Sequence, residues 1–278
     1  VQVKGAAFSR NKGESYFNAS LLSILSSDIE YFKIDTILQK KVQKKREKVS
    51  FNDWSLYDIV SPVLKGVTID SIGVKDTKFS YIQVTDKGVD SYKLNNFNFW
   101  ANRFSVDKLS EHNTSKLYST KFGFNATDFV CEMKTKNHRF DIDRIYMDTG
   151  EEAFYVKGIR LEPISQEKQY DYVSGTIDSV SIMGLNTEKS FKASRLMVKS
   201  PNVKYVRNYT VRKPKGAEVE EIQPDVEKPN TIDVLVALMN EYYVKEILLD
   251  SANFTYRYTK PKQLTQELKI ENFNFFAH

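Results

Sequence analysis

The chain has 278 residues, of which 41% are hydrophobic and 13% aromatic, so it is not a disordered chain and can bury a substantial core. Its 41 basic and 36 acidic residues give a formal charge of +5, a mild excess that permits contact with anionic surfaces but lacks the concentration typical of nucleic-acid binders. The one cysteine, Cys131, excludes an internal disulfide and a Cys-rich metal site.

No apolar run approaches the roughly 18 to 20 residues needed to span a bilayer. The chain begins at Val1 without an initiating Met or a signal peptide, and it stops at His278 within a strand-like pattern. We therefore expect a fragment, with any membrane anchor or targeting signal outside it.

The first part of the chain, residues 1 to 33, opens with a short alternating segment and a turn region around Asn11 to Gly13. The stretch from Phe17 to Leu25 fits a short helix or a strand equally well, because its periodicity does not separate the two.

A dense basic run follows, and two interpretations of it stay open: a solvated surface, or a contact with phosphate headgroups or another polyanion. The candidate headgroup contacts are Lys40, Lys41, Lys44, Lys45, Arg46 and Lys48. After this run, an apolar stripe predicts a short helix over residues 53 to 65, which ends at Gly66.

From Val67 the pattern is that of β-strands, and a ten-position template recurs. Its matches are Ile72-x-Val74-x-Asp76-x-x-Phe79-x-Tyr81, Phe122-x-Phe124-x-Ala126-x-x-Phe129-x-Cys131, Leu196-x-Val198-x-Ser200-x-x-Val203-x-Tyr205 and Ile247-x-Leu249-x-Ser251-x-x-Phe254-x-Tyr256. Within each match, a gap of five residues reverses the alternation of the strand. Both apolar pairs can face one side only if an extra residue lies between them, so we predict a β-bulge there and a curved sheet.

A partner strand with its own break in alternation follows three of the four matches. The closest pair of partner strands is residues 93 to 101 and residues 269 to 277, which share the pattern Lys-aliphatic-x-Asn-Phe-Asn-Phe-aromatic-Ala. Turn-forming residues such as Asp86-Lys87-Gly88 separate the two arms. The unit is therefore predicted to be a two-strand antiparallel hairpin of about 36 residues.

An aliphatic-Asp-x-aliphatic motif marks this period, at steps of 35, 37, 36 and 35 residues. Its copies begin at Ile34, Ile69, Val106, Ile142 and Ile177, with a looser copy at Ile232. We interpret each aspartate as marking the side of a strand that faces water.

The domain organisation follows from one break in the pattern. Residues 1 to 211 form the repeat β region, and residues 212 to 230, with three prolines and mixed charge, form a linker or loop. Residues 231 to 278 are predicted to hold a helix, over Ile232 to Tyr243, and a further truncated β repeat.

The fold class predicted is mainly β: an extended, curved antiparallel sheet with a few short helices, and one face apolar and aromatic. Either other parts of the chain cover that face, or it is a groove that holds something apolar. The candidate groove lining is Ile72, Val74, Phe79, Tyr81, Leu94, Phe97, Phe99, Phe254, Tyr256, Phe273 and Phe275.

The sequence contains no recognisable catalytic, cofactor-binding or metal-binding motif. The three histidines lie far apart, and we find no phosphate loop, dinucleotide fingerprint, nucleophile elbow or zinc pattern. We predict no catalytic residues, no cofactor and no metal site, and interpret Cys131 as a small buried hydrophobe. A hydrolase is the weakest hypothesis, because no nucleophile and base can be paired.

The bulged two-strand units, the recurring Ile-Asp-x-Ile motif and the segment Leu196-x-Val198-x-Ser200-Pro201-x-Val203-x-Tyr205 before a Pro-containing linker resemble the AsmA/TamB-like bacterial envelope proteins, in particular the form common in Bacteroidetes. The resemblance covers residues 30 to 278. It implies a periplasmic or cell-envelope location, anchorage in the inner membrane through a segment outside this chain, and lipid transport or outer-membrane maintenance.

The leading hypothesis is thus a non-enzymatic, lipid-handling β-groove whose partner is a lipid or another apolar chain. The alternative is a closed β-sandwich that serves as a structural or partner-binding module of a cell-envelope assembly.

Overall fold

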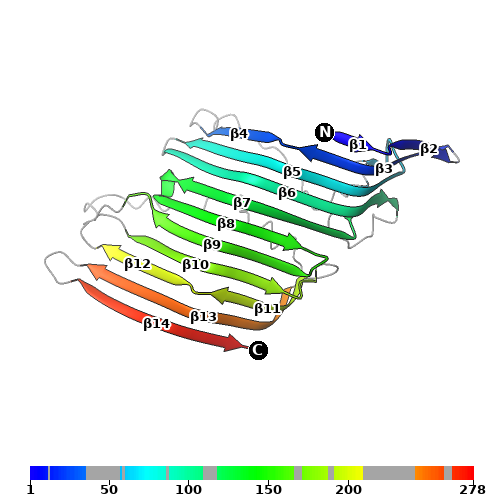
Figure 1. Ribbon diagram of the computed structural model, residues 1–278. Helices are drawn as coiled ribbons and strands as arrows, with labels where there is room; N and C mark the ends of the chain where they lie inside the picture. The colour runs from blue at the N-terminus through cyan, green and yellow to red at the C-terminus, as the bar shows by residue number, and fades with distance from the viewer. Residues whose placement is uncertain are drawn as a thin grey trace.

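The protein is mainly β, and its strands form one large mixed sheet (Figure 1). The computed structural model describes residues 1–11, 13–35, 57, 60–85, 88–108, 118–165, 171–186, 191–208, 242–259 and 265–278. Within these ranges the sheet has 14 strands, and there is no helix of seven or more residues. The described residues also contain no helix long and apolar enough to cross a membrane.

The strands vary from 3 to 20 residues in length. They are β1 (Gln2–Lys4), β2 (Ala7–Asn11), β3 (Glu14–Leu25), β4 (Asp28–Asp35), β5 (Gly66–Thr85), β6 (Gly88–Asp107), β7 (Lys121–Met133), β8 (His138–Asp148), β9 (Ala153–Pro163), β10 (Tyr172–Met183), β11 (Phe191–Lys199), β12 (Asn202–Asn208), β13 (Tyr242–Thr259) and β14 (Gln266–Ala277), with a short 3-10 turn, η4 (Lys134–Lys136), between β7 and β8. The stretch from Phe17 to Leu25 is therefore a strand.

Strands that follow one another in sequence mostly lie side by side, from β3 and β4 at one end of the sheet to β14 at the other (Figure 1). Two columns of the sheet consist of two short strands placed end to end. Both β3 and β4 pair with β5, and both β11 and β12 pair with β10 on one side and β13 on the other. At the first end, β1 and β2 cover the outer side of β3.

The sheet is mixed, so the prediction of a purely antiparallel sheet is wrong. β3 and β4 run parallel to β5, and β11 and β12 run parallel to β13. A parallel pair needs a crossover connection of a dozen or more residues. The segments that connect these pairs, residues 36–65 and 209–241, meet that requirement.

The predicted bulges are present in two of the four template matches. Between β5 and β6 the register shifts on both sides of Thr77, and between β13 and β14 it shifts on both sides of Ala252. Asp76 and Ser251, beside these shifts, have positive φ angles of 51° and 54°, which give the backbone the kink of a bulge. Ser200 also has a positive φ, of 49°, but it lies between β11 and β12, whose register with β10 and β13 does not shift there. In the Phe122 match the positive φ lies at Asp128 instead, two residues later than the template implied.

Other predictions fall largely on residues outside the described ranges: the basic run from Lys40 to Lys48 and the linker at 212 to 230. Of the helix predicted over 53 to 65, only residues 57 and 60–65 are described. They contain three turn hydrogen bonds: the Ser61 N–H donates to the Tyr57 carbonyl, and the Val63 and Leu64 N–H groups donate to the Val60 carbonyl. The helix predicted at 232 to 243 is wrong for its last two residues, Tyr242 and Tyr243, which belong to β13.

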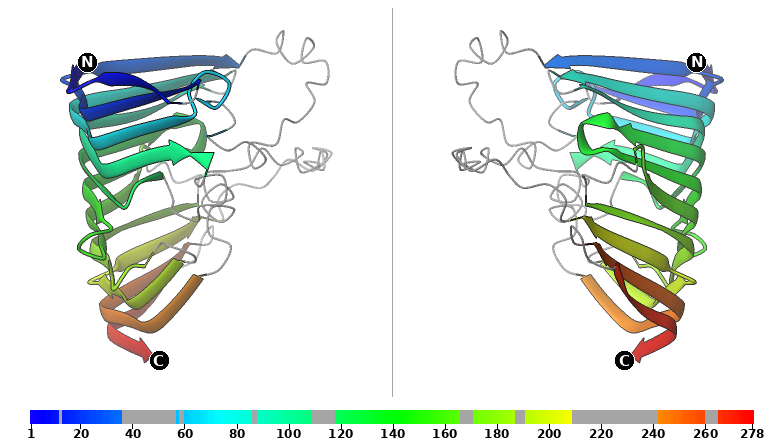
Figure 2. Two further views of the ribbon diagram at one scale, coloured as in Figure 1. Left: turned by 90° about the vertical axis from the view of Figure 1, so that its right-hand side faces the viewer. Right: turned by 90° about the vertical axis from the view of Figure 1, so that its left-hand side faces the viewer.

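The sheet is a single curved layer over the described residues (Figure 2). Each strand packs against its neighbours in the sheet, and the described residues contain no second sheet stacked on it. Ten apolar residues are buried among those that the structure describes, including Ile69, Val106 and Ile142. The two faces of the sheet are therefore its main surfaces.

Candidate functional site: the apolar face

One face of the sheet carries aligned rows of apolar side chains that run across the strands. We call it the apolar face, and the opposite one the polar face. The first row passes through Val74, Phe99, Phe124, Met147, Phe154, Ile182, Leu196 and Ile247. The second passes through Phe97, Ala126, Ile145, Val156, Val180, Val198, Leu249 and Phe275. The third passes through Ile29, Phe79, Leu94, Phe129, Ile142, Ile159 and Ile177.

Ring contacts show that neighbouring rows lie on the same face. Phe97, in the second row, packs edge-on against Phe79 of the third row with a centroid distance of 5.5 Å. It also stacks against Phe124 of the first row at 6.2 Å. Since these rings belong to three rows and three strands, the apolar face is continuous over the middle of the sheet.

Side chains normally alternate between the two faces along a strand, and successive strands interrupt this alternation at adjacent positions. The interruption lets three rows of side chains share one face. In β8, Ile142 and Ile145 are three residues apart and both lie on the apolar face, while Asp143 and Arg144 between them lie on the polar face. The Ile-Asp-x-Ile motif marks this break. Asp70, Asp143 and Asp178 are exposed, as predicted for the motif's aspartates, whereas Asp107 is half-buried. A strand with two successive side chains on its polar face is longer on that side, so we infer that the breaks bend the sheet toward the apolar face.

Gly158 shows how closely neighbouring strands approach at this level. It has a φ of +63°, and a Cβ atom there would overlap the carboxylate of Asp143 in the neighbouring strand. Asp143 in turn accepts a hydrogen bond from Arg160 at 2.6 Å. A glycine is therefore required beside the motif's aspartate at this position.

All the residues predicted to line a groove lie on the apolar face, but the structure divides them into two groups. The first group, from β5 and β6, is half-buried: Ile72, Val74, Phe79, Tyr81, Leu94, Phe97 and Phe99. The second group comes from β13 and β14, and three of its members, Phe254, Phe273 and Phe275, are 41%, 48% and 46% exposed. Tyr256, the fourth, is half-buried.

A shallow depression of about 260 Å³ lies where β4, β5, β6 and β7 meet on this face. Its apolar lining is Ile29, Tyr31, Phe79, Tyr81, Tyr92, Leu94 and Phe129. Tyr31 and Tyr81 stack at 5.6 Å, and Tyr81 and Tyr92 are 5.5 Å apart. Ile29 and Tyr31 were missed by sequence reasoning, although Leu22-x-Ile24-x-Ser26-x-x-Ile29-x-Tyr31 is a further match of the template.

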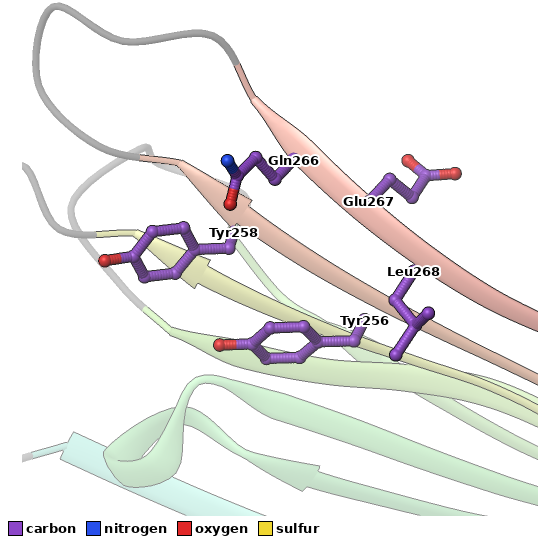
Figure 3. Close-up of a pocket in the computed structure, with 5 residues that line it drawn as sticks. All are labelled: Tyr256, Tyr258, Gln266, Glu267 and Leu268. Carbon is purple, nitrogen blue, oxygen red and sulfur yellow. The ribbon is translucent and has the colours of Figure 1, made fainter.

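A second hollow, of about 420 Å³, lies near the other end of the sheet (Figure 3). Tyr256 and Tyr258 project side by side, with Gln266 and Leu268 facing them from β14, while Glu267 points away (Figure 3). Glu267 forms an ion pair with Arg257 at 2.7 Å and with Lys269 at 3.1 Å. These hydrogen-bonded cations hold the pKa of Glu267 below its ordinary value.

The polar face carries ion pairs and a group of stacked rings. Tyr146 and Tyr155 stack at 4.9 Å, and the guanidinium of Arg144 lies 5.7 Å from the centre of each ring. Trp100 donates to Asp148 at 3.3 Å. Desolvation and a hydrogen bond to Glu151 raise the pKa of Tyr146 to about 12. Cross-strand contacts of this kind stabilise a sheet, and we assign them no chemistry.

The described residues contain no group of three His, Cys, Asp or Glu side chains that could hold a metal ion. Cys131 is 4% exposed, as predicted for a small buried hydrophobe, and burial raises the pKa of its thiol. His138 lies at the start of β8 with Nδ1 2.7 Å from the Lys136 carbonyl, and His278 lies 3.9 Å from Glu246. The third histidine, His112, is outside the described ranges, as are the six candidate headgroup contacts.

We therefore take the apolar face as the candidate site. Comparison of the chain with protein-family models, with curated proteins and with solved structures finds no match.

Proposed function

We propose that this chain is a non-enzymatic, lipid-handling β-groove segment of a cell-envelope protein, of the AsmA/TamB-like kind, built from repeated two-strand units. In this proposal it acts in lipid transport or outer-membrane maintenance from the periplasm. Membrane association is supplied by a segment outside this chain, and the basic run from Lys40 to Lys48 meets lipid headgroups.

The observation that carries the proposal is the set of apolar rows on a single-layer sheet. A row continues over eight strands, from Val74 in β5 to Ile247 in β13. An acyl chain that lies along such a row is sheltered at every strand, and each CH₂ group removed from water contributes about 0.8 kcal/mol. The rows run across the strands, so the sheet offers a path along its whole length.

The alternative, a closed β-sandwich, needs a second sheet to fill the apolar face. The described residues form one sheet, and large apolar side chains such as Phe254 and Phe273 remain 41% and 48% exposed. Contiguous apolar surface of this extent is typical of a binding surface. These observations favour the groove over the sandwich.

The test is lipid capture by the purified chain, followed by mass spectrometry and by uptake of a fluorescent phospholipid. The double variant Phe254→Asn and Phe275→Asn places polar groups on the apolar face. We expect uptake to fall at least about fourfold, the loss that corresponds to the burial of about one CH₂ group.

The matched control is Phe276→Asn. Phe276 is 61% exposed and is the neighbour of Phe275 in β14, but it lies on the polar face. We expect its uptake to be unchanged. Absence of co-purifying lipid, together with equal uptake by all the variants, would contradict the proposal.

A further inference from the structure

Where two charged residues lie directly opposite one another in neighbouring described strands, their signs are opposite at every position but one. The complementary pairs are Asp28 with Lys78, Glu132 with Arg139, Arg139 with Glu162, Asp141 with Arg160, Arg195 with Glu246, Lys199 with Asp250, and Arg257 with Glu267. The exception is Arg144 of β8, which lies opposite Lys157 of β9. Like charges directly opposite one another destabilise a sheet, so the strands themselves give no reason for this pair.

The pair lies on the polar face, in the interior of the sheet. Thr127 of β7 lies opposite Arg144, and Ser179 of β10 lies opposite Lys157, so a hydroxyl group flanks each cation. Both cations are exposed. Since β8 and β9 each have a neighbouring strand on both sides, the surroundings of the pair consist of described residues.

Within the described residues, neither cation forms an ion pair. Arg144 donates from Nε to Oδ1 of Asn125 at 2.6 Å, which leaves its two Nη groups as a fork of donors. Asp143, the next residue in the strand, is held by Arg160 at 2.6 Å. Asp178, close to this level in β10, is exposed and is not ion-paired with either cation. The two positive charges are therefore not neutralised by direct contact.

Two tyrosine rings hold the charges side by side. The Arg144 guanidinium lies 5.7 Å from the centres of the Tyr146 and Tyr155 rings, and Nζ of Lys157 lies 4.9 Å from the centre of the Tyr155 ring. These contacts offset part of the repulsion and restrict both side chains, which lowers the entropy cost of binding a ligand. The rings would hold a single cation equally well, so they explain where the charges lie but not why there are two.

We propose that Arg144 and Lys157 form a binding site for a phosphate monoester group on the polar face. Such a group carries a charge of about −1.5 to −2 at neutral pH, which matches two cations, whereas a carboxylate or a phosphate diester carries a single charge. The Nη groups of Arg144 bind two phosphate oxygens, Lys157 supplies a point charge, and the Ser179 hydroxyl is a further donor. The site lies on the face opposite the proposed lipid groove and does not depend on it.

The experiment measures the binding of inorganic phosphate to the full chain by isothermal titration calorimetry, with the ionic strength held constant by chloride. We expect saturable binding that chloride does not reproduce. Lys157→Met, which keeps an unbranched apolar side chain, should weaken it about fivefold, and the double variant Arg144→Gln and Lys157→Met should abolish it. Thermal unfolding checks that the variants are folded.

The matched control is Lys93→Met. Lys93 is an exposed lysine on the polar face of β6, and the residues opposite it, Ser80 and Val130, are uncharged. The same loss of charge there should leave phosphate binding unchanged.

A second measurement distinguishes a free phosphate from a lipid headgroup. The chain is sedimented with phosphatidylcholine vesicles that contain either phosphatidic acid, a phosphate monoester, or phosphatidylglycerol, a diester. If the natural ligand is a headgroup, phosphatidic acid should bind the chain more tightly, and Lys157→Met should remove the difference. If it is a free phosphate, inorganic phosphate should bind and Lys157→Met should not alter sedimentation with either vesicle.

The proposal is overturned if neither inorganic phosphate nor phosphatidic acid binds in a manner that depends on Lys157. It is also overturned if Lys93→Met weakens binding as much as Lys157→Met, because the ligand would then be attracted by the general charge of the face. The double variant Phe254→Asn and Phe275→Asn should bind phosphate as the natural chain does, so this proposal and that of the lipid groove can fail separately.

Discussion

The hairpins β5–β6 and β13–β14 share a register, a bulge and an asparagine that accepts a hydrogen bond from the backbone of the bulge, yet their side chains have different environments. Ala101 of β6 is 2% exposed, whereas the corresponding Ala277 of β14 is only half-buried. Leu94 and Phe97 are half-buried, whereas the corresponding Ile270 and Phe273 are 47% and 48% exposed. The sequence of a hairpin thus specifies which face is apolar, while burial depends on the strand that lies beside it.

The largest difference in stability between the two hairpins is expected when a phenylalanine on the apolar face is replaced by aspartate in each. Phe79→Asp puts a charge between Ile29 and Leu94 and should lower the free energy of unfolding by about 3 kcal/mol. Phe254→Asp lies at a 41% exposed position near the sheet edge and should lower it by about 1 kcal/mol. Urea unfolding followed by circular dichroism measures both, and equal losses would show that the neighbouring strands do not set the environment.

A smaller difference in stability is expected when the asparagine side chain that accepts a hydrogen bond from the backbone of the bulge is removed. Asn98→Ala leaves the N–H of Asp76 without its acceptor and should cost about 1 kcal/mol of unfolding free energy. Asn274→Ala removes the same bond from Ser251, but water reaches the edge strand more easily, so we expect about 0.5 kcal/mol. The comparison uses the same urea titration, and a larger loss for Asn274→Ala would reverse our account of the edge.

The labelling rate of an introduced cysteine tests the difference in exposure between Ala101 and Ala277, and the substitution itself should change stability little. In a Cys131→Ala background, cysteine at position 277 should react with a thiol reagent more than about tenfold faster than cysteine at position 101, because reaction at a buried site requires local opening. The measurement is the rate of labelling at neutral pH. Similar rates would mean that β7 does not protect β6 in solution.

The smallest effect concerns an interior strand on the polar face. The pKa of Tyr146 is raised to about 12, so its stabilising contribution is fully present below about pH 10, where the phenol of the unfolded chain ionises, and is lost as pH rises toward 12. We expect the stability of Tyr146→Phe to fall less steeply over that interval. Unfolding titrations at several pH values test this, and parallel curves would exclude the contribution.

Much of the fold could be predicted from the sequence because a break in alternation has few structural solutions. The spacing of Val74 and Phe79 requires an extra residue if both face one side, and the structure has the bulge at Asp76. The spacing of Ile142 and Ile145 likewise placed two aliphatic residues on one face. These predictions depend only on side-chain parity within a strand, which the sequence shows directly.

The relative directions of neighbouring strands and the positions of the strand ends were harder to predict from the sequence. An alternating pattern is the same for parallel and antiparallel neighbours, so the parallel pairing of β4 with β5 was not visible in it. The long stretches that interrupt the pattern at 36–65 and 209–241 were the available signal. The template match that ends at Tyr31 is hard to recognise in the sequence, because the periodicity of Phe17 to Leu25 fits a helix and a strand equally well. Which residues stay exposed depends on neighbours across the sheet, so the contrast between Phe97 and Phe273 could not be predicted.

The breaks in side-chain alternation lie at adjacent positions in successive strands, so the width and the length of the apolar face are set by different features of the chain. Each strand sets the width and bend of the apolar face through its own spacing of aliphatic residues, as Ile142 and Ile145 do in β8. The number of strands sets the length, which is on the order of 45 Å for the ten columns from β3 and β4 to β14 at about 4.8 Å each. Insertion or deletion of a hairpin would therefore change the reach of the surface by about 10 Å and leave its cross-section unaltered, so reach can evolve independently of what the surface binds.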